Sequence, residues 1–514
     1  MKKDRLLWAD DEIDLLRPYV LFLEEKGYEV VTASNGRDAF DLCSAQRFDL
    51  VFLDENMPGL SGLETLNLIK EAFPALPVIM ITKSEEENIM DQAIGNKIAD
   101  YLIKPVNPSQ ILLSLKKCLH QQAIITDTVA VDYRQRFQEI GSRISAAASL
   151  EDWMDVYRTL VRWELELSGA DTGMEELLVQ QKQEANRLFA RFITKHYPDW
   201  MSSAQRPLMS PDLFKTVVFP PLEEGEKVWF ILIDNFRFDQ WRTIRPLVQN
   251  DFTIDEQLCT SILPTATQYA RNAVFSGLMP LKIAQMFPDL WVDEDEEEGK
   301  NLNEAPLIQT QLDRYRKNWH FSYTKINDAA GGDKLLASMK QMMDNPLNVV
   351  VFNFIDMLSH ARTESKMIRE LASSEAAYRT LTESWFKHSA LSELLRFLSG
   401  QDVRVILTTD HGTVRVDNAI KVVGDRNTNT NLRYKVGKNL DYNPKQVFEV
   451  RNPARFHLPS PNLTSSYIFA MNNDFLAYPN NYNYYVSYYK DTFQHGGISM
   501  EEMLIPLITL DPKR

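Results

Sequence analysis

The stretch FDLVFLDENMPGLSG, residues 48–62, contains an apolar run that ends on Asp54 and leads into a turn rich in proline and glycine. A short apolar run bounded by turn residues is typical of a buried strand in a parallel sheet. Four similar runs lie around it in the first third of the chain: RLLWA, YEVVTA, PVIMIT and ADYLIK. Because amphipathic stretches separate the runs, we predict five parallel strands with crossover helices, a (βα)5 domain of the α/β class over residues 1–120.

Acidic and basic side chains follow these predicted strands. Asp10 and Asp11 come after the first run, Asp54 after the third and Lys104 after the fifth, and Thr82 ends the fourth. In an open α/β sheet, the carboxyl ends of parallel strands meet at one edge, where ligands bind. Phosphoryl transfer to a carboxylate needs a nucleophilic aspartate, carboxylates for Mg²⁺ and a cation for the developing charge. The sequence therefore predicts a phospho-acceptor site at this edge.

The motifs WADDE, LDENMPGLSG, MITKS and YLIKP resemble those of the receiver domains of two-component response regulators. Taken alone, paired acids at a strand end are more often ordinary loop residues, but here five elements stand in the receiver order. The resemblance implies that Asp54 accepts a phosphoryl group from a sensor histidine kinase. The Mg²⁺ ligands that it implies are Asp10, Asp11, Asp54 and the carbonyl of Asn56. The residues that would pair with the phosphoryl group or relay the change as switches are Lys104, Thr82 and Tyr101.

The next part of the chain, residues 121–205, has helical periodicity and no strand-like run, with Gly169 and Gly173 between two amphipathic stretches. We predict a helical bundle or coupling element there. The prolines that then mark a boundary are Pro207, Pro211, Pro220 and Pro221. Strand-like runs return beyond it in KVWFILID, LNVVVFNFID and DVRVILTTD, which predicts a second α/β domain over residues 206–514.

Aspartates and histidines cluster around these later runs. The motifs DMLSH and TTDHG each contain one aspartate and one histidine, and FQHGG contains a further histidine. A DxxxH pair alone is usually a surface pair, but together these residues are the ligand types of zinc sites that hydrolyse phosphate esters. The candidate ligands are Asp234, Asp356, His360, Asp410, His411 and His495. Among them lies PTATQYARNAVFSGLMP, a loop entering a helix whose first amides suit an anion.

The order of these residues resembles the alkaline phosphatase superfamily and, within it, the PglZ domain. The resemblance implies a threonine nucleophile, Thr267, ten residues before Gly277, with Thr265 as the alternative. One implied zinc site consists of Asp234, Thr267, Asp410 and His411. The other consists of Asp356, His360 and His495. Two weaker candidates for binding the phosphoryl oxygens are Arg271 and Asn272. The alkaline-phosphatase-like domain would then be a phosphodiesterase that uses two zinc ions.

Composition narrows the classes of function. The formal net charge is −15, so we expect no direct DNA binding without a local basic patch. The cysteines are widely separated, and no apolar run approaches the length of about eighteen residues that spans a membrane. We therefore expect a cytoplasmic protein without membrane insertion. Residues 415–445, rich in Lys and Arg, are expected to be a solvated insertion, with a loop that grips a charged substrate as the alternative. Residues 481–489, NYNYYVSYY, are expected to be a strand packed on the sheet, with a surface that stacks nucleobases as the alternative.

The order of receiver, helical segment and PglZ-like domain resembles the response regulators linked to type IX secretion. The resemblance implies a homodimer on phosphorylation and control of secretion genes through other regulators, such as a sigma factor or a secretion-system partner. Our leading hypothesis is a receiver-controlled zinc phosphodiesterase that acts on small nucleotide or oligonucleotide esters. The alternative is a signalling adaptor whose metal domain is structural or only binds a ligand. A DNA-binding regulator is the third hypothesis, and the net charge disfavours it.

Overall fold

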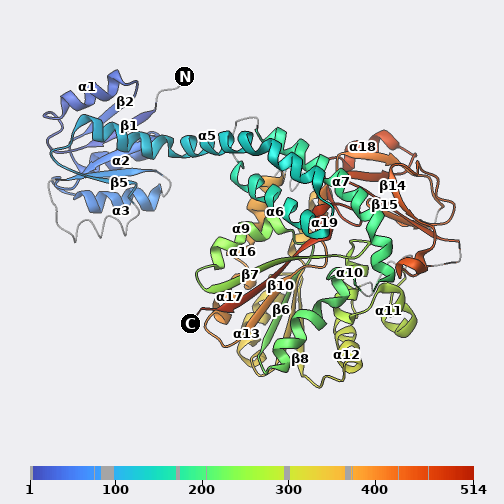
Figure 1. Ribbon diagram of the computed structural model, residues 1–514. Coiled ribbons are helices and arrows are strands. Elements are labelled where there is room, and N and C mark those ends of the chain that lie inside the picture. The colour runs from blue at the N-terminus through green and yellow to red at the C-terminus, as the bar shows by residue number, and fades with distance from the viewer. Residues whose placement is uncertain are drawn as a thin grey trace. The chain divides into compact units, whose positions relative to one another are not determined.

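The computed structural model of the chain describes residues 4–73, 76–82, 98–168, 174–203, 205–293, 301–364, 372, 374–425, 428–460, 462 and 464–513, except for the side chains of residues 82, 120–130 and 362–364. The chain divides into two compact units, Met1–Asp132 and Tyr133–Arg514 (Figure 1). No helix among the described residues is both long and apolar enough to cross a lipid bilayer.

The N-terminal unit is built on a five-stranded parallel sheet in the order β2-β1-β3-β4-β5. Its strands are β1 (Arg5–Ala9), β2 (Glu29–Ala33), β3 (Leu50–Asp54), β4 (Val78–Thr82) and β5 (Asp100–Ile103). Its helices among the described residues are α1 (Arg17–Glu25), α2 (Gly36–Ala45), α3 (Gly62–Ala72) and the first part of α5 (Pro108–Ala146), and the crossover predicted between β4 and β5 lies outside the described residues. Leu7 and Leu53 belong to one apolar core and Trp8 and Phe52 to another, so helices cover both faces of the sheet. The predicted (βα)5 receiver fold is confirmed.

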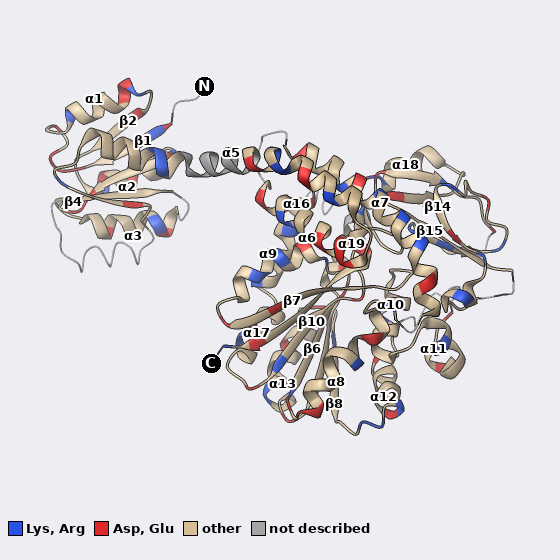
Figure 2. Cartoon of the chain, viewed as in Figure 1, with Lys and Arg blue, Asp and Glu red and all other residues tan. Residues whose placement is uncertain are grey.

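A helical segment opens the C-terminal unit. It consists of the end of α5, α6 (Leu150–Glu166) and α7 (Met174–Ser202). Trp153 packs edge-on against Phe189 in its core. Acidic and basic residues are interleaved along the outside of these helices (Figure 2), for example in the Arg162–Glu166 pair. The segment is helical as predicted, and the boundary predicted at residue 120 lies inside α5.

The start of α6 is fixed by a capping box. The Ser149 hydroxyl accepts a hydrogen bond from the Asp152 backbone N–H at 3.1 Å, and the Asp152 carboxylate accepts one from the Ser149 backbone N–H at 2.9 Å. We expect Ser149→Ala to lower the free energy of unfolding of this unit by about 1 kcal/mol, because one amide of the first turn loses its acceptor. Urea unfolding measures the change, and Ser142→Ala on the exposed face of α5 is the matched control. Equal stabilities of the two variants would contradict the role of the cap.

Ion pairs tie this helical segment to the rest of the C-terminal unit. Glu164 on α6 accepts from Lys182 on α7 and from Arg379, each at 2.7 Å. Arg379 lies 3.3 Å from Asp239, which in turn pairs with Arg237 at 2.6 Å. Because these charges are largely withdrawn from water, each needs its partner, and the network fixes the helices against the sheet domain.

A six-stranded mixed sheet forms the centre of the C-terminal unit, in the order β7-β18-β10-β6-β9-β8. Its strands are β6 (Val228–Ile233), β7 (Phe252–Thr260), β8 (Phe321–Ile326), β9 (Leu347–Phe352), β10 (Arg404–Thr408) and β18 (Leu504–Pro512). The four strands β8, β9, β6 and β10 are parallel, whereas β18 pairs antiparallel with β10 and β7. The predicted α/β architecture of this part is confirmed.

Helices cover both faces of this sheet (Figure 1). The helices of one layer are α9 (Phe238–Val248), α13 (Ala329–Met342), α16 (Glu375–Lys387) and α17 (Ala390–Leu398). Those of the other are α10 (Thr267–Ser276) and α12 (Glu304–Arg314). Further helices are α8 (Phe219–Glu223), α11 (Pro280–Met286), α14 (Phe354–Glu364) and α19 (Met500–Met503).

Small sheets between β10 and β18 form a separate layer. They contain β11 (Val414–Arg415), β12 (Asn418–Lys421), β13 (Tyr434–Gly437), β14 (Val447–Val450), β15 (Ser466–Ala470), β16 (Asp474–Ala477) and β17 (Phe493–Gln494). The expectation of a solvated basic insertion is wrong for Arg433 and Lys435, which are buried.

The expectation of a strand at residues 481–489 is also wrong, because these residues form helix α18 (Tyr482–Tyr489). Tyr484 stacks on Tyr488 and Tyr485 on Tyr489, with ring centroids 6.0 Å apart in each pair. Rings four residues apart meet in this way only on a helix. The stacking along the helix thus prevails over the strand propensity of tyrosine.

Candidate phospho-acceptor and metal sites

The predicted receiver residues converge at the carboxyl edge of the N-terminal sheet. Asp54 ends β3 and Asp10 follows β1, and both are buried. Lys104, which follows β5, places its Nζ 2.7 Å from Asp10 Oδ2 and 2.8 Å from Asp54 Oδ1. Burial raises the pKa of Asp54, an effect that the Lys104 ammonium partly offsets. The parallel register therefore creates an acidic pocket with one balancing cation, as the sequence predicted.

The remaining receiver residues differ in their exposure and in their contacts with Asp10 and Asp54. Asp11 is exposed, and its carboxylate is within 4.8 Å of those of Asp10 and Asp54. Asn56 follows β3, and its backbone N–H donates to Asp54 Oδ2 at 3.0 Å. Tyr101 lies half-buried in β5. Thr82 ends β4, but its side chain lies outside the described residues. The Mg²⁺ and switch roles of these residues stay predictions.

In the C-terminal unit, the predicted ligands gather where the parallel strands end. Asp234 follows β6, Asp410 and His411 follow β10, and α14 carries Asp356 and His360 just after β9. The candidate nucleophile begins α10, and His495 comes directly after β17. We call Asp234, Thr267, Asp410 and His411 the nucleophile group and Asp356, His360 and His495 the histidine group.

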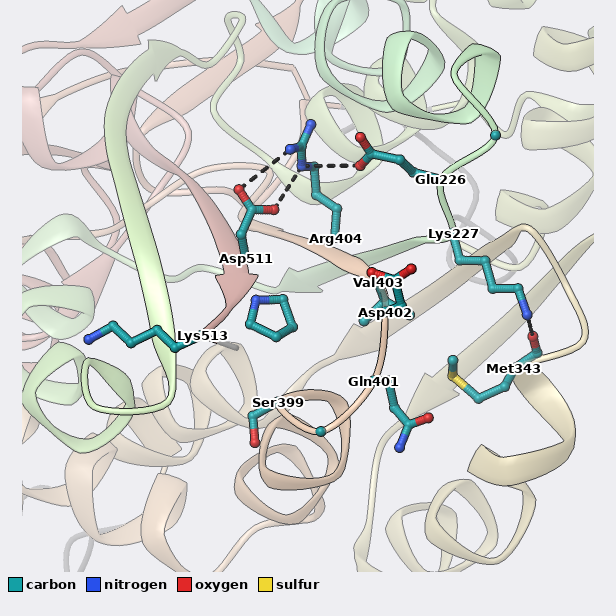
Figure 3. A pocket seen from close by; sticks show the side chains of 13 residues that line it. Glu226, Lys227, Met343, Ser399, Gln401, Asp402, Val403, Arg404, Asp511 and Lys513 are labelled. Atoms are coloured by element: carbon teal, nitrogen blue, oxygen red, sulfur yellow. Dashed lines mark hydrogen bonds and ion pairs between the residues drawn. The ribbon is translucent and has the colours of Figure 1, made fainter.

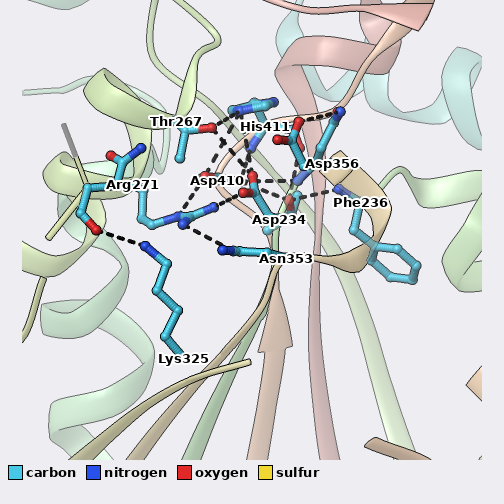
Figure 4. A network of polar contacts seen from close by, with 12 residues as sticks. Asp234, Phe236, Thr267, Arg271, Lys325, Asn353, Asp356, Asp410 and His411 are labelled. Carbon is cyan, nitrogen blue, oxygen red and sulfur yellow. Dashed lines mark hydrogen bonds and ion pairs between the residues drawn. The ribbon is translucent and has the colours of Figure 1, made fainter. Parts of the chain in front are cut away.

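The nucleophile group is compact (Figure 4), with Asp234, Asp410 and His411 buried and Thr267 half-buried. Thr267 Oγ1 lies 3.1 Å from His411 Nε2 and 3.5 Å from Asp234 Oδ1. His411 Nε2 is 3.9 Å from Asp234 Oδ1 and 4.0 Å from Asp410 Oδ2. Thr265, the alternative nucleophile, instead donates its hydroxyl to the Gly497 carbonyl at 2.9 Å. The structure thus places Thr267, and not Thr265, among the ligand atoms.

The histidine group lies directly beside it. His360 Nε2 is 3.4 Å and His495 Nε2 is 3.7 Å from the carboxylate of Asp356. The rings of His411 and His495 stack with centroids 4.2 Å apart, so the two groups are in direct contact. Burial is the first cause that lowers the pKa of His495 to about 3, so this ring is neutral at pH 7 and retains a lone pair.

Hydrogen bonds fix which nitrogen of each buried ring carries the proton. His411 Nδ1 is 3.1 Å from the Gly412 carbonyl, and His495 Nδ1 is 3.1 Å from the Thr265 carbonyl. Because a carbonyl oxygen only accepts, both Nδ1 atoms must donate. Each Nε2 then presents its lone pair to the neighbouring carboxylates, the orientation that metal-binding histidines have in proteins.

Asn235 links the two groups, and the sequence did not single it out. Its backbone N–H donates to Asp410 Oδ1 at 3.3 Å, and its side-chain Nδ2 donates to Asp356 Oδ1 at 3.1 Å. Its φ is +61°, a left-handed conformation in which asparagine is enriched. The asparagine directly after a strand-ending aspartate was the available signal, but nothing local reveals its two partners.

Both groups fit a zinc ion by donor type and spacing. Ligand atoms about 2.0–2.2 Å from a tetrahedral zinc lie about 3.3–3.6 Å from one another. The donor pairs quoted above are 3.1–4.0 Å apart, close to this range. Imidazole, carboxylate and hydroxyl oxygen suit zinc and also manganese. The arrangement is therefore able to hold two neighbouring divalent cations beside a hydroxyl.

Gly412 allows His411 to take this position. A Cβ added there would collide with the Glu501 carbonyl. We expect Gly412→Ala to lower the free energy of unfolding by about 1–3 kcal/mol and to weaken zinc binding, because the His411 loop must shift. Chemical unfolding and metal analysis measure the two effects. In the control Gly400→Ala, the added Cβ meets only the Phe397 carbonyl at 3.7 Å. A Gly412→Ala protein as stable as this control would rule out the close packing.

A further hollow of about 1180 Å³ lies at the opposite, amino-terminal ends of β6 and β10 (Figure 3). Lys227, Arg404 and Lys513 line it, but Arg404 pairs with Asp511 at 2.8 Å, and Lys227 and Lys513 donate to the carbonyls of Met343 and Gln249. With these cations engaged, the hollow offers little to an anionic ligand, and it contains none of the predicted site residues.

Three family models match successive parts of the chain. The receiver domain of response regulators matches residues 6–116, the PorX response regulator linker domain matches residues 123–201, and the BREX system PglZ alkaline phosphatase-like domain matches residues 213–510. This order is the PorX-type architecture that the sequence predicted.

Individual relatives match over a smaller part of the chain. The alginate biosynthesis transcriptional regulatory protein AlgB of Pseudomonas aeruginosa is 33% identical over 27% of this chain and 31% of its own length. The uncharacterized transcriptional regulatory protein YkoG of Bacillus subtilis is 33% identical over 25% of this chain and 57% of its own length. The chain thus spans about a third to somewhat over half of these relatives.

Among solved structures, two similar chains are response regulator proteins. The CheY-like receiver domain protein from Methanospirillum hungatei is 27% identical and covers 24% of this chain and 98% of its own, with a TM-score of 0.23. The response regulator TrrA from Thermotoga maritima, in complex with Mg²⁺ and BeF, is 31% identical and covers 23% of this chain and 99% of its own, with a TM-score of 0.21.

Proposed function

The chain belongs to the family of PglZ alkaline phosphatase-like domains, joined here to a receiver and a PorX linker domain, and we propose that it is a response regulator whose output is a zinc-dependent phosphodiesterase. The observation that carries the proposal is the position of Thr267 Oγ1, 3.1 Å from His411 Nε2 and 3.5 Å from Asp234 Oδ1. An alkaline phosphatase-like domain points to phosphoester hydrolysis, and this hydroxyl is the nucleophile that the chemistry needs.

The residues of the nucleophile group and the histidine group would each hold one zinc ion. When bound, zinc supplies a Lewis acid that lowers the pKa of a hydroxyl and stabilises negative charge on oxygen. Thr267 Oγ1 would attack phosphorus as the bond to the leaving alkoxide breaks, with the hydroxyl proton passing in net terms to that alkoxide, and water would then hydrolyse the phosphothreonine. The hydroxyl lies at the start of α10, where free backbone N–H groups and the helix dipole favour the phosphoryl anion.

We propose small nucleotide or oligonucleotide phosphodiesters as the substrate class. The support is the resemblance to phosphodiesterases of the alkaline phosphatase superfamily with a threonine nucleophile. The roles proposed for Arg271 and Asn272 toward phosphoryl oxygens stay predictions, since Arg271 is paired with Asp234 and Asp410. Hydrolysis of a nitrophenyl phosphodiester by the purified, zinc-loaded protein tests the activity. Two bound zinc ions without turnover would instead indicate a signalling adaptor.

A sensor histidine kinase is the partner that a receiver domain implies. We propose that phosphorylation of Asp54, with Mg²⁺ held by Asp10, Asp11 and the Asn56 carbonyl, drives homodimerisation. Signalling to a sigma factor or a secretion-system partner belongs to the same proposal, in place of direct DNA binding.

We expect the phosphoryl analogue beryllofluoride, with Mg²⁺, to shift the wild-type protein from monomer to dimer in sedimentation velocity. The reason is that Asp54 and Lys104 would reorganise around the added anion. Asp54→Ala removes the acceptor carboxylate and is expected to abolish the shift. Asp41→Ala, an exposed acid on α2, is the matched control and should dimerise like wild type. A sedimentation profile that beryllofluoride leaves unchanged in wild type would rule out this form of control.

A further inference from the structure

We propose that the two metal groups bind zinc with unequal affinity, and that the histidine group fills before the nucleophile group because Arg271 already pairs with both carboxylates of the latter. This inference rests on the metal pair of the proposed function and adds an order of filling. It assigns to Arg271 the role of an internal cation that competes with the second metal ion.

Arg271 lies on α10, one helical turn after the candidate nucleophile, and it is 1% exposed. Its Nε donates to Asp410 Oδ2 at 3.0 Å, and its Nη2 pairs with Asp234 Oδ2. On the other side, Nη1 is 3.7 Å from Glu304, which Lys325 contacts at 2.8 Å (Figure 4). Both carboxylates of the nucleophile group therefore share a cation that belongs to the chain itself.

The histidine group has a different balance of charge. Within the part of the chain that the structure describes, no lysine or arginine forms an ion pair with Asp356. Within the described residues, the side chains that contact this carboxylate are the two histidine rings of the group and the Asn235 amide, and the His411 ring lies near enough to act on its charge. Its negative charge is therefore available to an entering dication.

A dication that enters the nucleophile group lies close to the Arg271 guanidinium, because this group contacts two of the candidate ligands, Asp234 and Asp410. Like charges repel strongly at this range in a buried site, where the effective dielectric constant is far below that of water. The oxygen of Asp410 that faces His411 Nε2 is also the oxygen to which Arg271 donates. The metal and the arginine thus compete for Asp410 Oδ2, whereas Asp234 turns Oδ1 toward Thr267 and His411 and Oδ2 toward Arg271.

The order of filling has a consequence for activity. The histidine group is open to solvent at His360, whose side chain is 62% exposed, so it takes up the first ion readily. The group that contains the nucleophile fills last. Hydrolysis then follows the occupancy of the weaker site, and the protein with one bound ion is inactive.

A competition titration of the full-length, metal-free protein against a zinc-chelating dye measures both affinities, with excess Mg²⁺ present to fill the receiver site. Changes next to a metal ligand typically alter affinity by about 10–100-fold. We expect wild type to bind two ions whose dissociation constants differ by on the order of tenfold or more. His360→Ala should remove the tighter class and retain the weaker one.

Variants of the arginine test the cause. Arg271→Gln keeps a hydrogen-bond donor but loses the charge, and it should tighten the weaker class by on the order of tenfold. Arg271→Lys keeps the charge, so its weaker class of zinc sites should stay as weak as in wild type. Two equal classes in wild type, loss of the weaker class in His360→Ala, or no tightening in Arg271→Gln would overturn the inference. Wild type and His360→Ala decide the order of filling even if an Arg271 variant does not fold.

The same titration separates this inference from the proposed function. Two ions bound with unequal affinity but no hydrolysis of a diester would leave the order of filling intact and overturn the phosphodiesterase. Equal binding together with hydrolysis would do the reverse.

Discussion

Thr267→Ala is expected to lower the turnover of a nitrophenyl phosphodiester by the zinc-loaded protein by about three orders of magnitude or more. Thr267 Oγ1 is the hydroxyl that lies within 3.5 Å of both His411 and Asp234, and alanine leaves no oxygen there to attack phosphorus. The fall should appear in kcat, since the bond that the hydroxyl forms belongs to the chemical step. Zinc content, measured on the same samples, should change far less than turnover, because six other ligand residues remain.

Two further variants make this result specific. Thr267→Ser keeps the hydroxyl and should retain measurable turnover, which a purely structural role would not predict. Thr380→Ala removes a hydroxyl from the exposed face of α16 and should leave turnover unchanged. If wild type and Thr267→Ala hydrolyse the diester equally slowly, the activity belongs to a contaminant or to another residue. The assignment of the nucleophile would then be wrong.

The sequence predicted the parts of both sites that depend on strand ends. In a parallel sheet, a residue that follows a buried strand is delivered to one known edge, so Asp10, Asp54 and Lys104 converge without long-range information. Asp234 and Asp410 follow from the same argument in the second sheet. Histidine spacing added Asp356 and His360, which lie one turn apart on α14 as expected.

What the sequence left out depends on contacts between distant segments. Arg271 is near the nucleophile in the chain, but its pairing with Asp234 and Asp410 follows from the packing of α10 against the sheet. The same holds for Asn235, whose partners lie more than a hundred residues away. A local pattern named Arg271 without revealing its charge partners, and no local pattern singled out Asn235.

The small sheets between β10 and β18 were the least predictable part. A run of lysine and arginine usually indicates a solvated surface, yet Arg433 and Lys435 are buried. Arg433 is accommodated because Glu502, far along the chain, supplies a matching carboxylate. Composition reports the average environment of a residue type, and a buried ion pair is the exception that only the tertiary structure reveals.

Arg433→Met is expected to lower the free energy of unfolding of the C-terminal unit by about 3–5 kcal/mol, because it leaves a buried carboxylate without its cation. Arg433 and Glu502 are both fully buried and form a two-point pair, with Nε–Oε1 at 3.1 Å and Nη2–Oε2 at 2.6 Å. Glu502 also accepts from the Gly497 backbone N–H at 2.8 Å, two residues beyond His495. The pair thus anchors the loop that carries a metal ligand, and zinc binding by the histidine group should weaken in the same variant.

Chemical unfolding of matched variants separates the effect of breaking the buried pair from the general effect of replacing an arginine by methionine. Arg187→Met breaks a pair with Glu184 whose side chains are 49% and 46% exposed, and it should leave the stability close to that of wild type because water screens the pair. The double variant Arg433→Met/Glu502→Gln removes both charges and should recover part of the lost stability, since the penalty of the single variant comes from the unpaired carboxylate. If Arg433→Met is as stable as Arg187→Met, the Arg433–Glu502 pair does not hold this loop. The position of His495 must then depend on its hydrogen bond to the Thr265 carbonyl and on its contact with the His411 ring.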